Sequence, residues 1–263
     1  MGIKGVRKMR YTLIIATVFI LMNIAVVSGA PSEKISLLAA KNNAIQFSDI
    51  HSARMEYQNN FSTRSGDYYV FVSDRNRQYV NMRTGHVERA DYPDSFIARS
   101  PLMSISQENA MGIATAYAIA HYPNFTAKRM QLADASLLDH GITKEFQFVW
   151  REVIGDVISP NFILIQVNPE TGNINSYIGI SREIEVPLTP VVSKENAIAI
   201  ASKKFSSQNF SKIDVDLGIG YPEKDTQKLL WVVKFLGNTG DTVVQDRMIV
   251  IDAQTEQIYS QII

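Results

Sequence analysis

Ser106-Gln-Glu-Asn-Ala-Met-Gly-Ile-Ala114 and Ser193-Lys-Glu-Asn-Ala-Ile-Ala-Ile-Ala201 are two stretches of the chain that lie 87 residues apart and agree at six of nine positions. Each opens with a serine suited to cap a helix, followed by a glutamate in the first turn, where its charge complements the helix dipole. Alanine and isoleucine then recur at helical spacing. The two stretches therefore predict two equivalent helices. Their signature residues are Ser106, Glu108 and Ala110 in the first copy and Ser193, Glu195 and Ala197 in the second.

A second pattern recurs three times, at offsets of 87 and 84 residues, and is typical of a tight hairpin. It reads Val80-Asn-Met-Arg-Thr-Gly-His-Val87, Val167-Asn-Pro-Glu-Thr-Gly-Asn-Ile174 and Ile251-Asp-Ala-Gln-Thr-Glu-Gln-Ile258. An Asn or Asp side chain can bond the turn backbone, and a glycine can take a positive φ. Glu256 replaces the glycine in the last copy, at a cost of up to about 1 kcal/mol if the left-handed conformation is kept, so a different turn there stays open. The signature residues of this turn are Thr84, Gly85, Thr171, Gly172 and Thr255.

Apolar residues alternate with polar ones between each helix and its hairpin, as in strands that bury one face. The clearest runs are Phe146, Phe148 and Trp150 in one copy and Trp231, Val233 and Phe235 in the other. The N-terminal part is looser, with a helix expected within residues 32–46 and alternation through Ala53, Met55 and Tyr57. We expect three copies of one unit, the first of them divergent.

A helix followed by several antiparallel strands predicts the α+β class, here as tandem repeats in which each helix packs on a small antiparallel sheet. The expected units are residues 31–90, which are divergent, and residues 106–180 and 193–263. Residues 90–105 and 181–192 each contain two prolines and are expected to be linkers. Because these linkers are short, neighbouring units should touch.

The first 30 residues have the order of a signal peptide, with basic residues before an apolar run and small residues after it. If the apolar run Tyr11–Val27 is not removed, its length of about 17 residues is enough to span a membrane as an N-terminal anchor. The sequence therefore predicts an exported protein, secreted or held at the outer face of the cytoplasmic membrane. Membrane contact is expected only through this segment.

Charge and composition exclude several classes of function. The four basic residues before the apolar run leave 22 of the 26 basic residues against 26 acidic ones, and the negative balance argues against a nucleic-acid partner. The chain has no cysteine, so disulfides, thiolate metal sites and a cysteine nucleophile are excluded. The four histidines lack ligand spacing, and neither a metal site nor a cofactor is expected. They are His51, His86, His121 and His140.

The helix motif Ser-x-Glu-x-Ala-x-x-Ile-Ala and the closing turn Val-Asn-x-x-Thr-Gly-x-Ile together resemble the PepSY module, including the related segments in propeptides of thermolysin-type proteases. The resemblance covers residues 106–180 and 193–263 well and residues 32–89 more weakly. It implies a protein without catalytic residues that contacts or restrains a peptidase. Because no protease domain follows and no His-Glu-x-x-His occurs, the restraint would act on a separate protein, either a peptidase or another protein of the cell envelope.

Other residues that could carry chemistry have simpler structural interpretations. Asp214 and Asp216 share one strand face and could bind Ca²⁺, but a solvated face opposite Val215 explains them as well. Trp150 and Trp231 could form binding platforms, although tryptophan on an alternating strand usually belongs to a core. We therefore expect no enzyme, and the signature residues are interpreted as fold determinants.

Two further points stay open at the level of the sequence. Asn60, Asn124 and Asn209 head Asn-x-Ser/Thr sequons and are candidate glycosylation sites in a host that glycosylates exported proteins. The leading hypothesis is an interaction protein outside the membrane that binds a peptidase or its substrate, through a free sheet edge that accepts an extended strand. The alternative is a structural or small-ligand-binding envelope protein with no peptidase partner.

Overall fold

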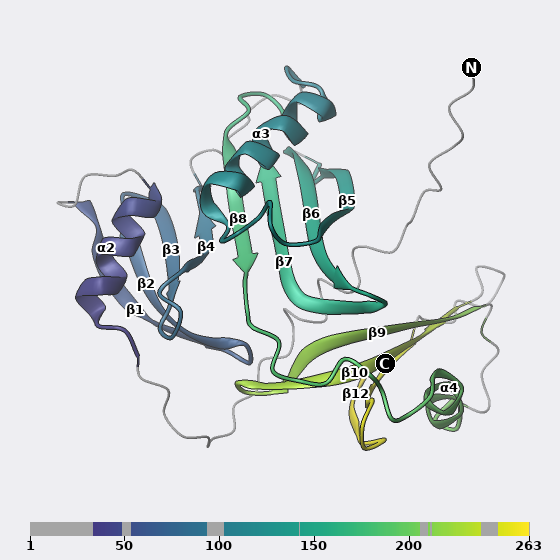
Figure 1. Ribbon diagram of the computed structural model, residues 1–263. Coiled ribbons are helices and arrows are strands. Elements are labelled where there is room, and N and C mark those ends of the chain that lie inside the picture. Colours follow the sequence, from purple (N-terminus) through teal and green to yellow (C-terminus); the bar gives the residue numbers. More distant parts are fainter. Residues whose placement is uncertain are drawn as a thin grey trace.

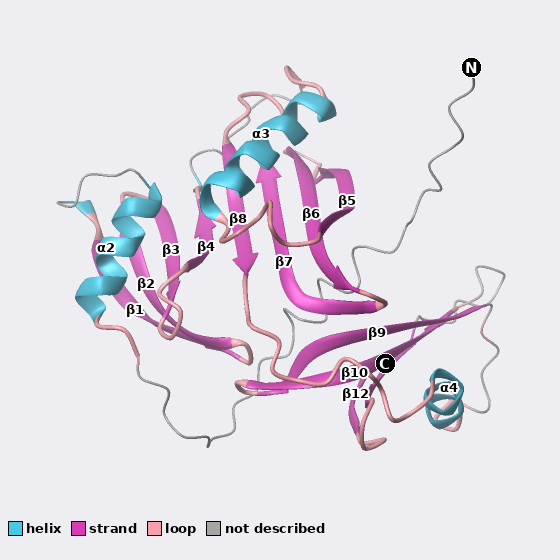
Figure 2. Cartoon of the chain, viewed as in Figure 1, coloured by secondary structure: helices cyan, strands magenta, loops and turns pink. Residues whose placement is uncertain are grey.

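A computed structural model of the chain describes residues 34–48, 54–93, 103–141, 143–205, 210, 212–237 and 247–262 (Figures 1 and 2). The predicted signal segment lies outside these residues. In chain order the elements are α2 (Leu37–Ser48), β1 (Glu56–Thr63), β2 (Gly66–Ser73), β3 (Asn76–Asn81), β4 (Val87–Asp91), α3 (Gln107–His121), β5 (Met130–Asp139), β6 (Lys144–Ile154), β7 (Val157–Val167), β8 (Ile174–Ile180), α4 (Lys194–Ser202), β9 (Lys212–Glu223), β10 (Thr226–Leu236), β11 (Arg247–Asp252) and β12 (Ile258–Ile262).

The twelve strands form one sheet in the order β1-β2-β3-β4-β8-β7-β9-β10-β11-β12, and β6 and β5 continue it beside β7. Strand β4 pairs antiparallel with β8 in the register Arg89 to Ile178. Strand β7 pairs antiparallel with β6 and β8, and its first residues pair parallel with β9 in the register Val157 to Leu217. The sheet turns sharply at this point, so that β9 and β10 are seen edge-on below β6, β7 and β8 (Figure 1).

The expected class of tandem repeats, each with a helix on its own small sheet, is wrong. The structure is mainly β, with one mixed sheet of twelve strands and three helices. The alternation in the sequence shows which residues face a core, but it does not show which strands pair. The edge of β4 and the first residues of β7 carry backbone groups that need hydrogen-bond partners, and the neighbouring strands β8 and β9 supply them.

Alanines allow the helices to lie close to the sheet. Helices α2 and α3 lie side by side on the same face (Figure 1), and their alanines enter a single core. Helix α4 packs on a second core, which includes Trp231, Val233 and Phe235. The fully buried alanines of the three helices are Ala40, Ala44, Ala110, Ala114, Ala118, Ala197 and Ala201.

Each helix begins with a serine cap. The Oγ atoms of Ser106 and Ser193 accept hydrogen bonds of 3.1 Å from the backbone N–H groups of Asn109 and Asn196. Ser36 caps α2 in the same way, through a bond of 3.1 Å from Ala39. The sequence pattern missed Ser36, because no glutamate follows it in the first turn. A cap of this kind typically contributes about 1 kcal/mol to helix stability.

The three closing turns have the same hydrogen bonds. In each, an Asn or Asp Oδ1 atom accepts from the backbone two and three residues ahead, with distances of 2.7–3.2 Å. The side chains that accept are those of Asn81, Asn168 and Asp252. Gly85, Gly172 and Glu256 then take the left-handed conformation, with φ of 74°, 77° and 66°. The last turn therefore keeps the shape of the other two despite its glutamate.

Each turn is also joined to the start of a helix. The carbonyl that follows the Asn or Asp accepts backbone N–H groups from the residues just before the helix cap, at distances of 2.8–3.1 Å. The pairs are Ile35 with Met82, Ser104 and Ile105 with Pro169, and Val191 and Val192 with Ala253. These bonds set the distance between a helix start and the hairpin that lies below it.

The turn at Glu256 predicts a stabilising substitution. Glu256→Gly removes the penalty of a Cβ atom in the left-handed region, so the free energy of unfolding should rise by about 1 kcal/mol. Urea denaturation followed by circular dichroism measures the change. The matched control is Gln257→Gly in the same turn, where φ is not positive and added backbone freedom should lower stability. A gain with Gln257→Gly, or a loss with Glu256→Gly, would contradict the left-handed turn.

Candidate functional site

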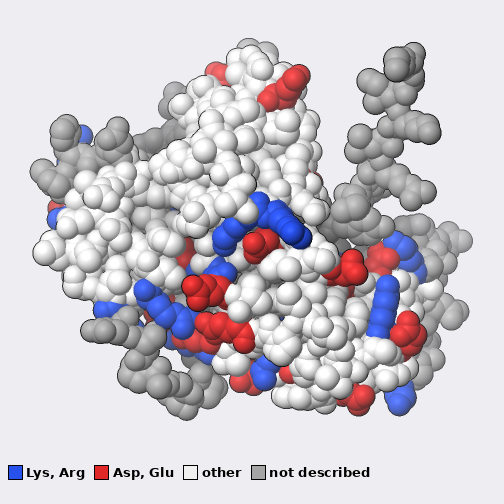
Figure 3. All heavy atoms as spheres, viewed as in Figure 1, with Lys and Arg blue, Asp and Glu red and all other residues white. Residues whose placement is uncertain are grey.

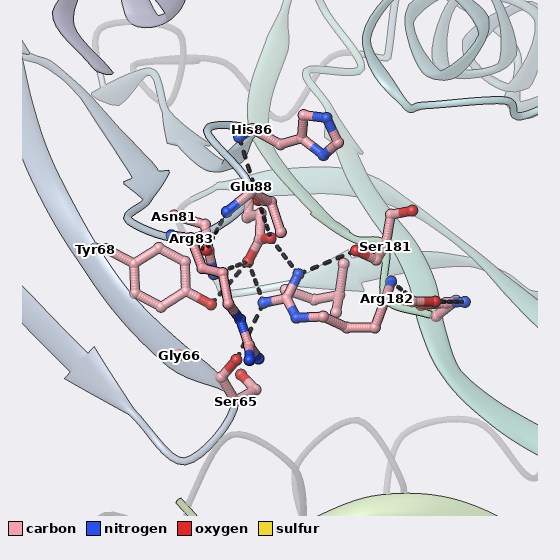
Figure 4. A network of polar contacts seen from close by, with 12 residues as sticks. Ser65, Gly66, Tyr68, Asn81, Arg83, His86, Glu88, Ser181 and Arg182 are labelled. Atoms are coloured by element: carbon pink, nitrogen blue, oxygen red, sulfur yellow. Dashed lines mark hydrogen bonds and ion pairs between the residues drawn. The ribbon is translucent and has the colours of Figure 1, made fainter. Parts of the chain in front are cut away.

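A buried ion pair lies where the parts of the sheet meet (Figure 4). The Arg182 guanidinium, two residues beyond β8, forms a two-bond pair with the Glu88 carboxylate of β4. The bond from Nη2 to Oε2 is 2.8 Å long, and a second joins Nη1 to Oε1. The two side chains are only 5% and 1% exposed, so this pair is removed from water. Planar two-bond pairing is the geometry that gives arginine its advantage over lysine with carboxylates.

Neighbouring groups supply further bonds to both charges (Figure 4). The Tyr68 hydroxyl of β2 donates to Glu88 Oε2 at 2.8 Å, and Asn81 Nδ2 donates to the same atom at 3.4 Å. Arg182 Nη2 also donates to the Ser65 carbonyl in the turn between β1 and β2, at 3.1 Å. We call these five residues, Arg182, Glu88, Tyr68, Asn81 and Ser65, the Arg182 network. It joins three strands, one turn and the segment that leads to α4.

The charges and hydrogen bonds of the Arg182 network shift the pKa values of Arg182 and Tyr68. Burial alone would lower the pKa of Arg182, but the hydrogen bonds and charge of Glu88 outweigh it and raise the pKa. Burial, and next the negative charge of Glu88, raise the pKa of the Tyr68 hydroxyl well above its usual range. Tyr68 therefore remains a hydrogen-bond donor at neutral pH. The donors around Glu88 are directed at its carboxylate, an arrangement that holds a structure together rather than one that moves protons.

The segment after β8 is held by its backbone as well. Asn161 of β7 accepts from the Arg182 N–H at 2.6 Å and donates to the Arg182 carbonyl at 3.0 Å. The same amide donates to Glu152 Oε2 at 2.7 Å, and Glu152 also accepts from Ser159 at 2.8 Å. Lys128 binds the Ser181 hydroxyl at 2.9 Å. The path of the chain from β8 toward α4 is thus fixed on both sides of Arg182.

The hairpin of β9 and β10 contacts the hairpin of β1 and β2 close by. Lys224 Nζ lies 2.6 Å from Asp67 Oδ1, and the Asp225 N–H donates to the Arg64 carbonyl at 2.8 Å. Burial would raise the pKa of Asp67, but hydrogen bonds from Lys224 and Ser62 and the charges of Lys224 and Lys34 lower it. Figure 3 shows charged side chains gathered over this junction, while the part of the surface over α2 and α3 carries few.

The residues singled out in the sequence lie mostly outside this network. The signature residues occupy the helix starts and the closing turns, and only Thr84 reaches the network, through its hydroxyl 3.4 Å from Glu88. Trp150 and Trp231 are buried in the two cores. Asp214 and Asp216 form ion pairs with Lys212 and Lys234. Asn60 is exposed on β1 and Asn124 is exposed after α3, whereas Asn209 and His51 lie outside the described residues.

The described ranges contain no group of three or more histidine, aspartate or glutamate side chains placed to hold a metal ion. Nor does any helix within them have the length and apolarity needed to cross a membrane. His121 packs between the rings of Phe47 and Tyr117, and its burial lowers the pKa of its imidazole.

Sequence reasoning missed the Arg182 network. Glu88 and Arg182 lie 94 residues apart, so no local spacing relates them. The available signal was weak: Glu88 directly follows a closing turn, and Arg182 opens an expected linker. Nothing in that pattern shows that both side chains are buried.

Comparison with known proteins gives little further identification. No protein-family model matches the chain, and no curated protein is significantly similar to it. Among solved structures, the chain is similar to the Bacillus megaterium YpeB C-terminal domain, with 17% sequence identity over 87% of this chain and 97% of that chain. The TM-score is 0.44, and a likeness of this size does not place the chain in a family.

The Arg182 network predicts an asymmetric response to substitution. Arg182→Met leaves the Glu88 carboxylate buried without its main partner, so the free energy of unfolding should fall by about 3–5 kcal/mol. The double variant Arg182→Met with Glu88→Leu removes both charges and should recover at least about half of that loss. Urea denaturation measures both variants.

An exposed ion pair is the matched control for this prediction. Arg54 and Asp74 lie 3.9 Å apart with side chains 72% and 67% exposed, so Arg54→Met should lower stability by less than about 1 kcal/mol. If Arg182→Met is no more harmful than Arg54→Met, the buried pair does not organise the junction.

Proposed function

We propose that this chain is a non-catalytic contact protein outside the cytoplasmic membrane that binds an extended segment of a partner along strand β1. The observation that carries the proposal is the open edge of this strand. Among the described strands, β1 lies at the end of the sheet and pairs with β2 alone. All of its eight residues except Thr63 are exposed. Alternate residues of an edge strand point their N–H and C=O groups away from the sheet, where a further strand can pair with them.

Strand β1 lacks the features that usually protect an edge. Proteins guard such strands with charged residues, prolines or short length. In β1 the sequence is Glu-Tyr-Gln-Asn-Asn-Phe-Ser-Thr, with one charge at its first residue and no proline. One irregularity in register, between Tyr57 and Asn59, interrupts its pairing with β2. The segment from Asn59 to Thr63 pairs regularly and offers the longest uninterrupted edge of this strand.

The other edges of the sheet are better guarded. Strand β5 carries Asp134 and Asp139, and the Gln107 side chain of α3 donates to its Ala135 carbonyl at 2.9 Å. Strand β12 has five residues. The edge of β9 is covered by β7 only at Leu217 and Gly218, but this strand carries Lys212, Asp214, Asp216 and Pro222. This comparison favours β1 as the edge that accepts a partner.

The edge is also held rigid. The rings of Tyr57 and Phe61 contact aromatic rings of β2 and β3, with centroids 5.6–6.4 Å apart. At the end of the hairpin, the bond from Arg182 to the Ser65 carbonyl fixes the turn. A strand held in its bound conformation loses less entropy on binding, which favours affinity.

A peptidase is the partner that the sequence motifs favour, because their resemblance to PepSY modules implies contact with proteases. The predicted export signal supports a site of action outside the cytoplasmic membrane. An N-glycan on Asn60 would block β1, so glycosylation at this residue and binding along this edge exclude one another.

The test is to capture partner proteins with the full-length chain in its native envelope. The effect of the chain on each captured peptidase is then measured as a change in that peptidase's activity. In the Asn60→Pro variant, capture should fall at least about tenfold, because proline removes an N–H that points off the sheet. Thr63 pairs with Gly66 across a two-residue turn, where the paired residues exchange backbone hydrogen bonds. Such pairs alternate along an antiparallel ladder with pairs that exchange none, and Asn60, which pairs with Tyr69 three positions back, belongs to the second kind. The N–H of Asn60 therefore points away from β2.

The matched control is a proline on the guarded edge. Leu137 lies on β5 two residues from Ala135, whose carbonyl faces away from the sheet. The Leu137→Pro variant should leave capture unchanged. Urea denaturation confirms that both variants fold. Equal loss of capture in the two variants, or none in Asn60→Pro, would refute binding along β1.

A further inference from the structure

Helices α2 and α3 present an outer surface with an unusual composition for a water-exposed layer. The two helices contain 27 residues between them, and Lys41 and Glu108 are their only Lys, Arg, Asp or Glu residues. A surface helix normally carries charged residues on the side opposite the core. The exposed side here is defined by Leu38, Asn42, Ile113, Ala116, Ile119 and Ala120, and we call it the α2/α3 face.

The α2/α3 face carries large exposed apolar side chains. Leu38 is 69% exposed and Ile119 is 53% exposed, and each belongs to a helix whose inner side is already buried in the core. Figure 3 shows this part of the surface almost free of charged groups, in contrast to the junction below it. Large apolar side chains left exposed on helices whose inner side is already buried indicate a contact with another apolar body.

The chain itself indicates what that body is. The apolar run Tyr11–Val27 ends seven residues before Lys34, where the described structure begins. Seven residues span at most about 25 Å in any conformation. Helix α2 follows directly and is about 18 Å long. If the run spans a membrane, these seven residues act as a tether that keeps the start of the described structure within about 25 Å of the lipid surface. The effective concentration of α2 at that surface is then high.

Charge selects the side that faces the membrane. After the basic start the chain carries 22 basic and 26 acidic residues, so anionic lipids repel the protein as a whole. A face without charges avoids this repulsion and places its leucine and isoleucine side chains among the acyl chains. A helix lying in the membrane interface uses the same kind of burial.

We propose that the α2/α3 face rests on the outer surface of the membrane in which the segment Tyr11–Val27 is anchored. The proposal depends on the export and location given under the proposed function, and on an anchor that stays attached. In this orientation the part of the sheet under α2 and α3 lies along the membrane, and the edge strand β1 stays open to a partner beside the protein (Figure 1).

The absence of cysteine allows a direct test with single thiol labels on the full-length chain. Leu38→Cys and Ile119→Cys variants carry an environment-sensitive fluorophore and are reconstituted into phosphatidylcholine and phosphatidylglycerol vesicles that contain spin-labelled lipid. Both labels should shift their emission to the blue, and the spin-labelled lipid should quench at least about half of it. Val191→Cys is the matched control, because Val191 is an aliphatic residue, 77% exposed, in the segment before α4, and its label should show neither effect.

Each other outcome overturns the proposal. Labels at positions 38 and 119 that behave like the label at 191 show that the face stays in water. A blue shift without quenching by spin-labelled lipid shows that protein covers the face, such as a second copy of the chain. Quenching at all three positions shows adsorption without a preferred face. Capture of a peptidase through β1 is read separately with the Asn60→Pro variant, so the two proposals can fail independently.

Discussion

The buried pair of Arg182 and Glu88 is the interaction on which the arrangement of the sheet depends. Arg182 lies where the chain leaves β8 for α4, and Glu88 lies on β4, so their contact joins the first four strands to the segment that follows β8. Removing two charges from water is costly, and the pair is tolerated because Tyr68, Asn81 and Ser65 supply the remaining hydrogen bonds. Its value lies in specificity, since few other arrangements of the chain satisfy both charges at once.

The joined sheet also limits the number of open edges. Three separate four-stranded meanders would leave six edge strands, each a template for unwanted pairing. Pairing of β4 with β8 removes two of them, and the parallel contact of β7 with β9 covers part of a third. The strands that remain at an edge are β1, β5, β12 and the part of β9 outside Leu217 and Gly218. Strand β9 carries Lys212, Asp214, Asp216 and Pro222, so β1 is the least protected of these edges. The backbone groups of β1 are therefore the least guarded among the edges of the described sheet.

Local features could be predicted from the sequence, whereas the relations between distant segments could not. The caps at Ser106 and Ser193 and the three closing turns depend on residues within one turn of each other, and they appear as hydrogen bonds in the structure. The continuous sheet depends on pairing between strands such as β4 and β8, for which alternation gives the buried face but no partner. The Arg182 network lies wholly in this second class. Ser36 is an intermediate case, because its cap is local but its helix lacks the shared glutamate.

Two buried glutamates are committed to hydrogen bonds within the fold. A carboxylate that acts on a substrate needs a free lone pair directed at that substrate. Glu88 instead receives bonds from an arginine, a tyrosine and an asparagine, and Glu145 from Gln166, Asn175 and a contact with His140. Both carboxylates are buried and committed to holding strands together. The proposed contacts with an extended chain and with lipid use other groups instead, the backbone of β1 and the exposed apolar side chains of the α2/α3 face.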